Sequence, residues 1–300
     1  MGKYISYITF RIFLFIFKLL PFWVVYKIAD LLYFLLFRVT GYRKKVIVTN
    51  LKNSFPDKSD ADINLIAKSA YKNLADIMVE GIKGASMNKK QIMDRYRFMN
   101  PELLDGCFES EQSVILVAGH YNNWEWAALS PPYFIKHHTV ALYKKLHNKY
   151  LEDYMKRTRS HTGESLYELK ETQLAFDKHV HANPPALFLL AADQSPSNTA
   201  SGYWIDFLNQ KTPCLHGPEK YARLYNMPIV YCCPIRKGRG KYELVLEWLV
   251  TDPNEFGDGQ ITLAFMHRLE KDILENPGSW LWSHKRWKHQ YNGEEVVDNI

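Results

Sequence analysis

Residues 113–126 read SVILVAGHYNNWEW, and this stretch decides how the rest of the chain is interpreted. The apolar run from Val114 to Ala118 is typical of a buried strand, and Gly119 marks the turn that ends it. Beyond the turn, Asn122 or Asn123 can cap a helix that begins directly after them. Active sites of α/β folds lie where a buried strand leads through a polar loop into a helix.

His120 and Glu125 are the two residues of this stretch that are suited to proton transfer. A histidine accepts a proton near neutral pH, and a carboxylate on its other ring nitrogen fixes the tautomer and stabilises the imidazolium. On one continuous helix the two side chains would lie about 140° apart. We therefore expect His120 in the turn and Glu125 on the first turn of the helix, folding back towards the ring.

Further apolar runs alternate with helical patterns downstream, which predicts an α/β fold with a mixed, mostly parallel sheet flanked by helices and antiparallel strands late in the chain. Residues 42–98 are expected to be helical throughout. No low-complexity linker follows, so residues 42–300 are predicted to form one domain. The other predicted strands are Thr139–Tyr143, Ala186–Ala191, Ile229–Ile235 and Tyr242–Trp248, and the helices between and after them are Tyr150–Arg159, Thr172–His181, Pro218–Tyr225 and Gln260–Glu275.

Residues 1–41 have a different pattern, being strongly apolar but interrupted by charges such as Arg11, Lys18 and Lys27. No uncharged span of about 18 residues exists there, so a membrane-spanning helix is not predicted. Two amphipathic helices on either side of Pro21, lying in a membrane interface, fit the pattern better. The alternatives are a cleaved signal peptide, for which no small-residue cleavage site follows, and helices packed into a soluble core.

The chain has 300 residues and a formal net charge of +6, which favours an anionic partner such as a lipid headgroup surface or an acidic carrier protein. Nucleic acid is disfavoured because no finger spacing, ribonucleoprotein motif or basic arm is present. The four cysteines lack the spacing of a metal or redox pair, and no histidine lies beside an acidic cluster, so no metal site is predicted. An interfacial anchor beside anionic lipid is suggested by Lys285, Arg286 and Lys288, interleaved with Trp282 and Trp287, and the alternative is a ribbon of solvated charge.

Several motifs, taken in their order along the chain, resemble one family. They are Tyr42-Arg43 to Asn50-Leu51, Ser54-Phe55-Pro56, Gly119-His120 to Glu125, the Arg157/Arg159 stretch, Ala192-Asp193-Gln194, Phe207 to Thr212 and Leu281 to Lys288. The chain resembles the lysophospholipid acyltransferase superfamily and, within it, the lipid A late acyltransferases that acylate the Kdo-lipid A precursor.

This resemblance implies direct transfer of a fatty acyl group from acyl carrier protein or coenzyme A to a lipid hydroxyl, with no cofactor and no covalent enzyme intermediate. It implies a membrane lipid as acceptor, contact with the membrane surface, and a location at the cytoplasmic face of the inner membrane. His120 would be the general base and Glu125 its partner, while Arg157 or Arg159 would stabilise the oxyanion. The residues assigned to substrate binding are Asn123, Arg157, Arg159, Asp193 and Gln194.

The acceptor stays open at this stage, because residues 195–202 depart from the proteobacterial lipid A enzymes. A lysophospholipid, an aminolipid or a phosphatidylinositol mannoside would need much the same chemistry. A noncatalytic membrane scaffold is an alternative of another class, but it would gain nothing from His120 and Glu125. A hydrolase is disfavoured, since the G-x-S-x-G elbow is absent and the cysteines have no obvious catalytic partner.

Overall fold

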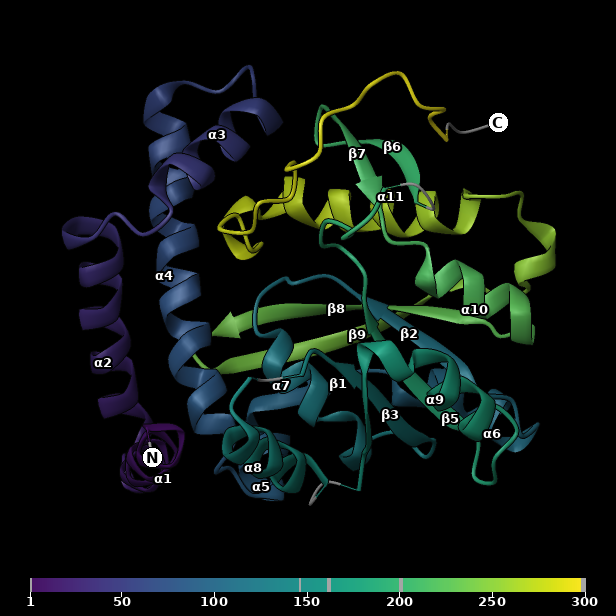
Figure 1. The fold of residues 1–300 in the computed structure, drawn as a ribbon, viewed down its shortest axis with the longest axis horizontal. Helices are drawn as coiled ribbons and strands as arrows, with labels where there is room; N and C mark the ends of the chain where they lie inside the picture. The colour runs from purple at the N-terminus through teal and green to yellow at the C-terminus, as the bar shows by residue number, and fades with distance from the viewer. Residues whose placement is uncertain (1, 146, 161–162, 200–201, 298–300) are drawn as a thin grey trace.

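A seven-stranded sheet forms the centre of the computed structural model, which describes residues 2–145, 147–160, 163–199 and 202–297 (Figure 1). Five neighbouring strands run parallel to one another, and the other two strands, which form one edge of the sheet, run in the opposite direction. The predicted mixed, mostly parallel sheet is therefore confirmed. In spatial order the strands are β1 (Tyr96–Phe98), β9 (Lys241–Val250), β8 (Ile229–Gly238), β2 (Val114–Ala118), β5 (Ala186–Ala191), β3 (His138–Tyr143) and β4 (Ser165–Glu168).

Every strand predicted from an apolar run is present, and the antiparallel pair expected late in the chain is β8 with β9. The expectation of helix throughout residues 42–98 is wrong at β1, where Tyr96 to Phe98 pair with β9. Three residues are too few to carry a periodicity, so pairing with a distant strand decides their conformation. Two further features were not predicted, namely β4 and a separate hairpin of β6 (Tyr203–Phe207) and β7 (Gln210–Cys214).

Helices cover both faces of the sheet, which explains why β2 is a continuous apolar run. Ile115 and Val117 belong to the core on one face, while Val114 and Leu116 belong to the core on the other. The first face carries α9 (Thr172–His179), α10 (Gly217–Tyr225) and α11 (Gln260–Glu275), and the second carries α5 (Lys89–Arg95), α6 (Asp105–Glu109), α7 (Trp124–Leu129) and α8 (Lys149–Ser160) (Figure 1).

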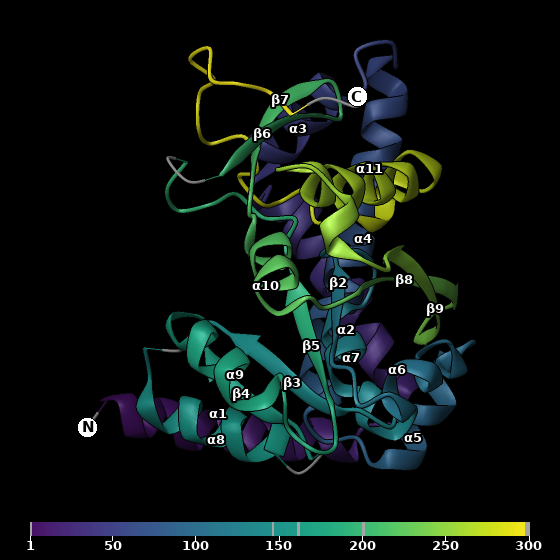
Figure 2. The same cartoon turned by 90° about the vertical axis from the view of Figure 1, so that its right-hand side faces the viewer.

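Two helices open the chain on either side of Pro21, as predicted: α1 (Gly2–Leu19) and α2 (Phe22–Phe34). A short π-helix follows and leads through α3 (Lys44–Ser54) into the long helix α4 (Asp60–Gly84). Figure 1 shows α2 and α4 side by side along one end of the sheet, and Figure 2 shows α1 lying beside α8. Among the described residues, no helix combines the length and the apolar character needed to cross a bilayer.

Helix α4 anchors the N-terminal helices by apolar and polar contacts. Val25 and Ala29 of α2 pack in a small core with Val79 of α4. The buried ammonium of Lys83 donates hydrogen bonds to three carbonyl oxygens at the end of α1, at 2.8 to 2.9 Å. The last carbonyls of a helix lack partners within it, so Lys83 satisfies the C-terminus of α1.

The side of α1 and α2 that does not face α4 is apolar and exposed. Trp23 is 70% exposed and Leu19 is 67% exposed, although both are large hydrophobic residues. Many exposed large hydrophobic side chains on two neighbouring helices are typical of a site that contacts another apolar phase or partner. Other exposed side chains of this kind include Ile12, Phe15, Ile16, Leu31, Phe34 and Val39.

The close approach of α4 to α7 depends on a glycine. A Cβ atom at Gly84 would lie 2.7 Å from Nε1 of Trp126, a fully buried side chain. That same Nε1 donates a 2.9 Å hydrogen bond to the carbonyl of Glu80, so the ring cannot move away without losing this bond.

We predict that Gly84→Ala lowers the free energy of unfolding by about 1–3 kcal/mol, because overpacking a fixed aromatic ring forces the two helices apart. Urea or thermal unfolding of the purified protein in detergent measures the change. Gly106→Ala in α6 is the matched control, since a Cβ there meets nothing within 4 Å. Equal stability of the two variants would contradict the proposed packing constraint.

Candidate active site

His120 and Asp193 meet at the same edge of the sheet because β2 and β5 are parallel neighbours. Ala118 pairs with Ala191 at the ends of these strands, and His120 and Asp193 each follow two residues later. Nδ1 of His120 lies 2.6 Å from Oδ1 of Asp193, and the backbone N–H of His120 donates to Oδ2 at 2.8 Å. The indole of Trp280 donates to the same Oδ2 at 2.8 Å. The buried Asp193 carboxylate is thus held by three donors.

The two residues shift each other's pKa in opposite directions. Burial by itself raises the pKa of Asp193, but the charge of His120 and the hydrogen bonds from His120 and Trp280 outweigh it and lower that pKa to about 2. Burial lowers the pKa of His120, but the charge and hydrogen bond of Asp193, with a contribution from the charge of Glu125, raise it above its ordinary value. Asp193 is therefore ionised at neutral pH, and His120 binds a proton more strongly than an isolated imidazole does.

An ionised Asp193 decides the tautomer of the neutral imidazole. Nδ1 then carries the proton and donates it to the carboxylate, which leaves Nε2 as an acceptor. The Gln194 amide nitrogen lies 3.1 Å from Nε2 and donates to it. Nε2 of His120, the accepting nitrogen of the ring, thus faces a hydrogen-bond donor, the amide of Gln194.

Local sequence explains how the loop reaches this geometry. A Cβ at Gly119 would lie 2.7 Å from the Leu269 side chain and 3.4 Å from Oδ2 of Asp193, so only glycine permits the close passage of the chain. Asn122 has φ of 47°, in the left-handed region that asparagine tolerates well, and its amide donates to the Pro234 carbonyl at 2.7 Å. These features turn the chain from β2 into α7.

Glu125 lies on the first turn of α7, and His120 lies in the preceding loop, which is the placement expected from the sequence. Glu125 and His120 line the same cavity, and Oε1 of Glu125 accepts a 3.2 Å hydrogen bond from the Trp124 indole. However, the carboxylate found on Nδ1 of His120 belongs to Asp193. Asp193, which was predicted to bind substrate, therefore occupies the position on Nδ1 of His120 that was predicted for Glu125.

The structure places the other residues predicted to bind substrate in different surroundings. Gln194 lies at the imidazole, as described above, whereas Asn123 is completely buried. Its Oδ1 accepts from the backbone N–H of Trp126 at 2.9 Å, which caps α7, and its Nδ2 donates to Glu80. Arg157 and Arg159 belong to α8, but their side chains lie outside the described part of the structure.

The interfacial anchor suggested by residues 282–288 is wrong at Trp282 and Arg286, while Trp287 is partly buried and Lys285 and Lys288 are exposed. Trp280 and Trp282 are buried, and the guanidinium of Arg286 is also buried, donating to the Pro213 carbonyl at 2.7 Å. Trp280 was missed as a site residue because a tryptophan in an aromatic, basic segment gives no sign that its indole will meet a carboxylate far away in sequence.

An apolar cavity of about 460 Å³ opens beside His120. This volume falls in the range of about 300–1,000 Å³ that is usual for ligand pockets. The cavity lies between the sheet and helices α7 and α8, and it extends from β8 and β2 to β3 and β4. Its walls are mainly small or aliphatic side chains, among them Leu116, Ala128, Ala141, Leu142, Leu166 and Leu189.

Comparison with known proteins gives one family. The sequence model described as bacterial lipid A biosynthesis acyltransferase matches residues 2–289, which is nearly the whole chain. No protein with curated annotation matches the chain.

We predict that Asp193→Asn lowers the pKa of His120, because it removes the main influences that raise the pKa and leaves burial, which lowers it. The imidazole then loses its proton at lower pH than in the unaltered protein. Histidine-selective NMR titration measures this, with the His120 signal assigned by its loss in His120→Gln. Glu125→Gln, which removes a lesser influence, should lower the pKa less. An unchanged titration in Asp193→Asn would show that the pair does not interact as described.

Proposed function

Because this chain belongs to the bacterial lipid A biosynthesis acyltransferase family, and is therefore an acyltransferase, we propose that it transfers a fatty acyl chain to a hydroxyl of a lipid A precursor with His120 as general base. The donor is an acyl thioester, on acyl carrier protein or coenzyme A. No other cofactor is needed, since the donor already carries the activated acyl group.

The observation that carries this proposal is the position of His120 at the mouth of an apolar cavity with a carboxylate on its Nδ1. The side chain of His120 is 18% exposed, so its ring is shielded but accessible. A substrate hydroxyl that replaces the Gln194 amide at Nε2 would donate its hydrogen to that nitrogen. Asp193 would hold the ring in place and stabilise the imidazolium that forms.

The proposed reaction proceeds by direct attack. The hydroxyl oxygen forms a bond to the thioester carbonyl carbon while its proton moves to Nε2 of His120. The tetrahedral intermediate then collapses, the carbon–sulfur bond breaks, and the leaving thiolate takes the proton from the imidazolium. The products are an acyl ester and a thiol, and the imidazole returns to its starting state.

The cavity beside His120 fits the acyl chain of the donor. Its walls are apolar, so moving an acyl chain from water into the cavity is favourable. The stabilisation is about 25 cal/mol for each Å² of apolar area that is buried. With the chain held there, the carbonyl carbon would lie at the cavity mouth beside the imidazole. Glu125, also at the cavity, keeps its place in the proposed catalytic site through its charge, which helps to raise the pKa of His120.

The exposed apolar surface of α1 and α2 supports contact with a membrane. We place this surface at the cytoplasmic face of the inner membrane, where the lipid acceptor is found, with the helices lying on the bilayer. Lipid acceptor and apolar helices would then share one interface.

We predict that His120→Ala and Asp193→Asn each lower the rate of acyl transfer by about 10²–10⁴-fold, the usual contribution of a general base and its orienting partner. The assay uses purified protein, a Kdo-lipid A precursor and acyl carrier protein or coenzyme A thioesters, with products identified by mass spectrometry. His181→Ala, at an exposed histidine, should retain activity.

Full activity in a folded His120→Ala variant would exclude the proposed base. If the unaltered protein acylates a lysophospholipid, an aminolipid or a phosphatidylinositol mannoside instead of the lipid A precursor, the acceptor proposed above is excluded while the chemistry stands.

We predict that Ala128→Leu shifts the preference of the enzyme towards shorter acyl donors, because the larger side chain fills part of the cavity. The relative kcat/KM for a series of acyl thioesters of different chain length measures the shift. Ala61→Leu, on an exposed position of α4, is the control. An unchanged order of donors in a folded Ala128→Leu variant would remove the cavity as the acyl site.

A further inference from the structure

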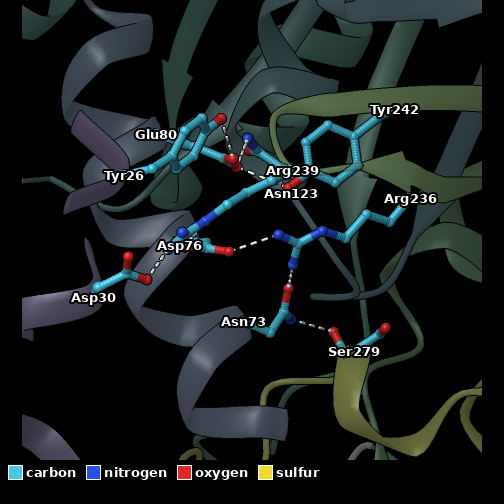
Figure 3. A network of polar contacts seen from close by, with 10 residues as sticks. All are labelled: Tyr26, Asp30, Asn73, Asp76, Glu80, Asn123, Arg236, Arg239, Tyr242 and Ser279. Atoms are coloured by element: carbon cyan, nitrogen blue, oxygen red, sulfur yellow. Dashed lines mark hydrogen bonds and ion pairs between the residues drawn. The ribbon is translucent and has the colours of Figure 1, made fainter. Parts of the chain in front are cut away.

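Helix α4 buries a row of polar side chains against the catalytic loops (Figure 3). Asn73, Asp76 and Glu80 are spaced three and four residues apart, so they lie on one face of the helix, and all three are buried. Asp76 receives Arg236 at 2.5 Å and Arg239 at 2.6 Å, and Arg239 also pairs with Asp30 of α2 at 2.7 Å. Sequence analysis assigned no role to any of these side chains.

Glu80 has the closest connection to the catalytic loop. Its Oε2 accepts hydrogen bonds from Asn123 Nδ2 at 2.7 Å and from the Tyr242 hydroxyl at 2.8 Å. Its Oε1 accepts from the Tyr26 hydroxyl at 2.9 Å, and its backbone carbonyl accepts from the Trp126 indole. The carboxylate is completely buried and meets donors from α2, β9 and the start of α7.

Asn123 connects Glu80 to the loop that carries His120. Asn123 donates through Nδ2 to Oε2 of Glu80, so its amide oxygen is directed to the backbone N–H of Trp126. Asn123 is the N-cap of α7 and lies between His120 in the loop and Glu125 on the first helical turn. The neighbour of Glu80 also touches the site, since a Cβ at Gly81 would lie 3.5 Å from Cγ of Glu125.

We propose that Glu80 is a positioning residue for acyl transfer, which sets the place of His120 and Glu125 by holding the Asn123 amide. This proposal rests on the function proposed above. Glu80 touches neither His120 nor the cavity in the contacts described here, and it acts through Asn123.

The same helix face also holds the other side of the site. Asn73 donates to the Ser279 carbonyl at 3.0 Å, and that carbonyl also accepts from the backbone N–H of Asn122. The residue after Ser279 is Trp280, whose indole binds Asp193, and Leu281 donates its backbone N–H to the His120 carbonyl. Helix α4 therefore contacts the loop that carries His120 and the segment whose Trp280 binds Asp193.

The chemical character of Glu80 favours a positioning role over simple packing. Burial raises its pKa to about 7, against hydrogen bonds from Tyr242 and Tyr26 that lower it. A buried carboxylate is costly, and apolar residues of similar volume often stabilise a fold as well or better. A carboxylate at this place has the specific effect of accepting from several donors and so choosing one orientation for each of them.

The test exchanges the two partners. Asn123→Asp keeps an N-cap oxygen but places a second carboxyl group against Glu80, and the two can share one proton at neutral pH. Measured above neutral pH, where that proton is lost and two carboxylates face each other, kcat should fall by about 10²-fold, the scale expected for a small misplacement of catalytic groups. Glu80→Gln alone should cost much less, because its amide oxygen can accept from Asn123 while its nitrogen meets the Tyr26 hydroxyl. In the double variant Glu80→Gln/Asn123→Asp, the amide donates to the carboxylate, and most of the lost kcat should return.

Asn123→Ser supplies a second route should Asn123→Asp fold poorly, since serine caps α7 but cannot donate to Glu80 in the same way. It should lower kcat while leaving KM for the acyl donor nearly unchanged. Tyr26→Phe is the matched control, because it removes a donor from the same carboxylate at the other oxygen and leaves the Asn123 bond intact. Its kcat should stay close to that of the unaltered enzyme.

The double-variant result decides the proposal. Recovery of kcat, together with the expected loss in Asn123→Ser, supports positioning through this hydrogen bond. A double variant no better than Asn123→Asp, or a folded Asn123→Ser with unchanged kcat, overturns it. Failure of the proposed function has a different signature, namely that the unaltered protein shows no acyl transfer or that His120→Ala keeps it.

Discussion

The Asp193 carboxylate is the point on which the geometry of the site depends. It binds the ring and the backbone of His120 and the indole of Trp280, so it joins the ends of β2 and β5 to the C-terminal segment. Its low pKa keeps it charged, and a charged carboxylate gives the strong hydrogen bonds that hold three groups together. Without it, the imidazole would lack the carboxylate that fixes its tautomer and its orientation.

The polar face of α4 holds the loops that carry His120 and Trp280, the two residues that bind Asp193. The parallel strands β2 and β5 bring His120 and Asp193 to one edge of the sheet. They do not by themselves fix the conformation of the loops that follow them. Glu80 and Asn73 bind one loop each, through Asn123 and the Ser279 carbonyl. Since α4 also carries the contacts to α1 and α2, the same helix holds the helices with exposed apolar side chains and the loops around His120 and Trp280.

The local part of this arrangement could be predicted from the sequence. The apolar run before Gly119, the cap residues and the spacing of His120 and Glu125 are all carried by neighbouring residues, and the structure has them in the expected elements. Continuous apolar runs likewise gave the central strands. The short strand β1 escaped prediction because its conformation depends on pairing with β9, about 150 residues away in sequence.

The partners of the site could not be predicted for the same reason. Which carboxylate reaches Nδ1 of His120 depends on which strand lies beside β2, and nothing near His120 in the sequence states that this strand is β5. Glu80 gave even less sign of its role, because it is one of several acidic residues in a long helix, and such residues are normally exposed to solvent. Asn123 was recognised as a possible cap, but its second hydrogen bond, to Glu80, depends on how α4 packs against α7.

The position of α8 connects the two surfaces that the proposed reaction needs. Glu152 and Lys156 of this helix line the cavity, while Tyr150 and Tyr154 contact aromatic side chains of α1. Helix α1, which lies beside α8 (Figure 2), in turn carries exposed apolar side chains. A lipid acceptor held at a membrane under α1 would therefore have one helix between itself and the acyl chain in the cavity. In the proposed reaction, a lipid hydroxyl would reach His120 while its own acyl chains stay in the bilayer, so the large apolar part of the acceptor would not need to enter water.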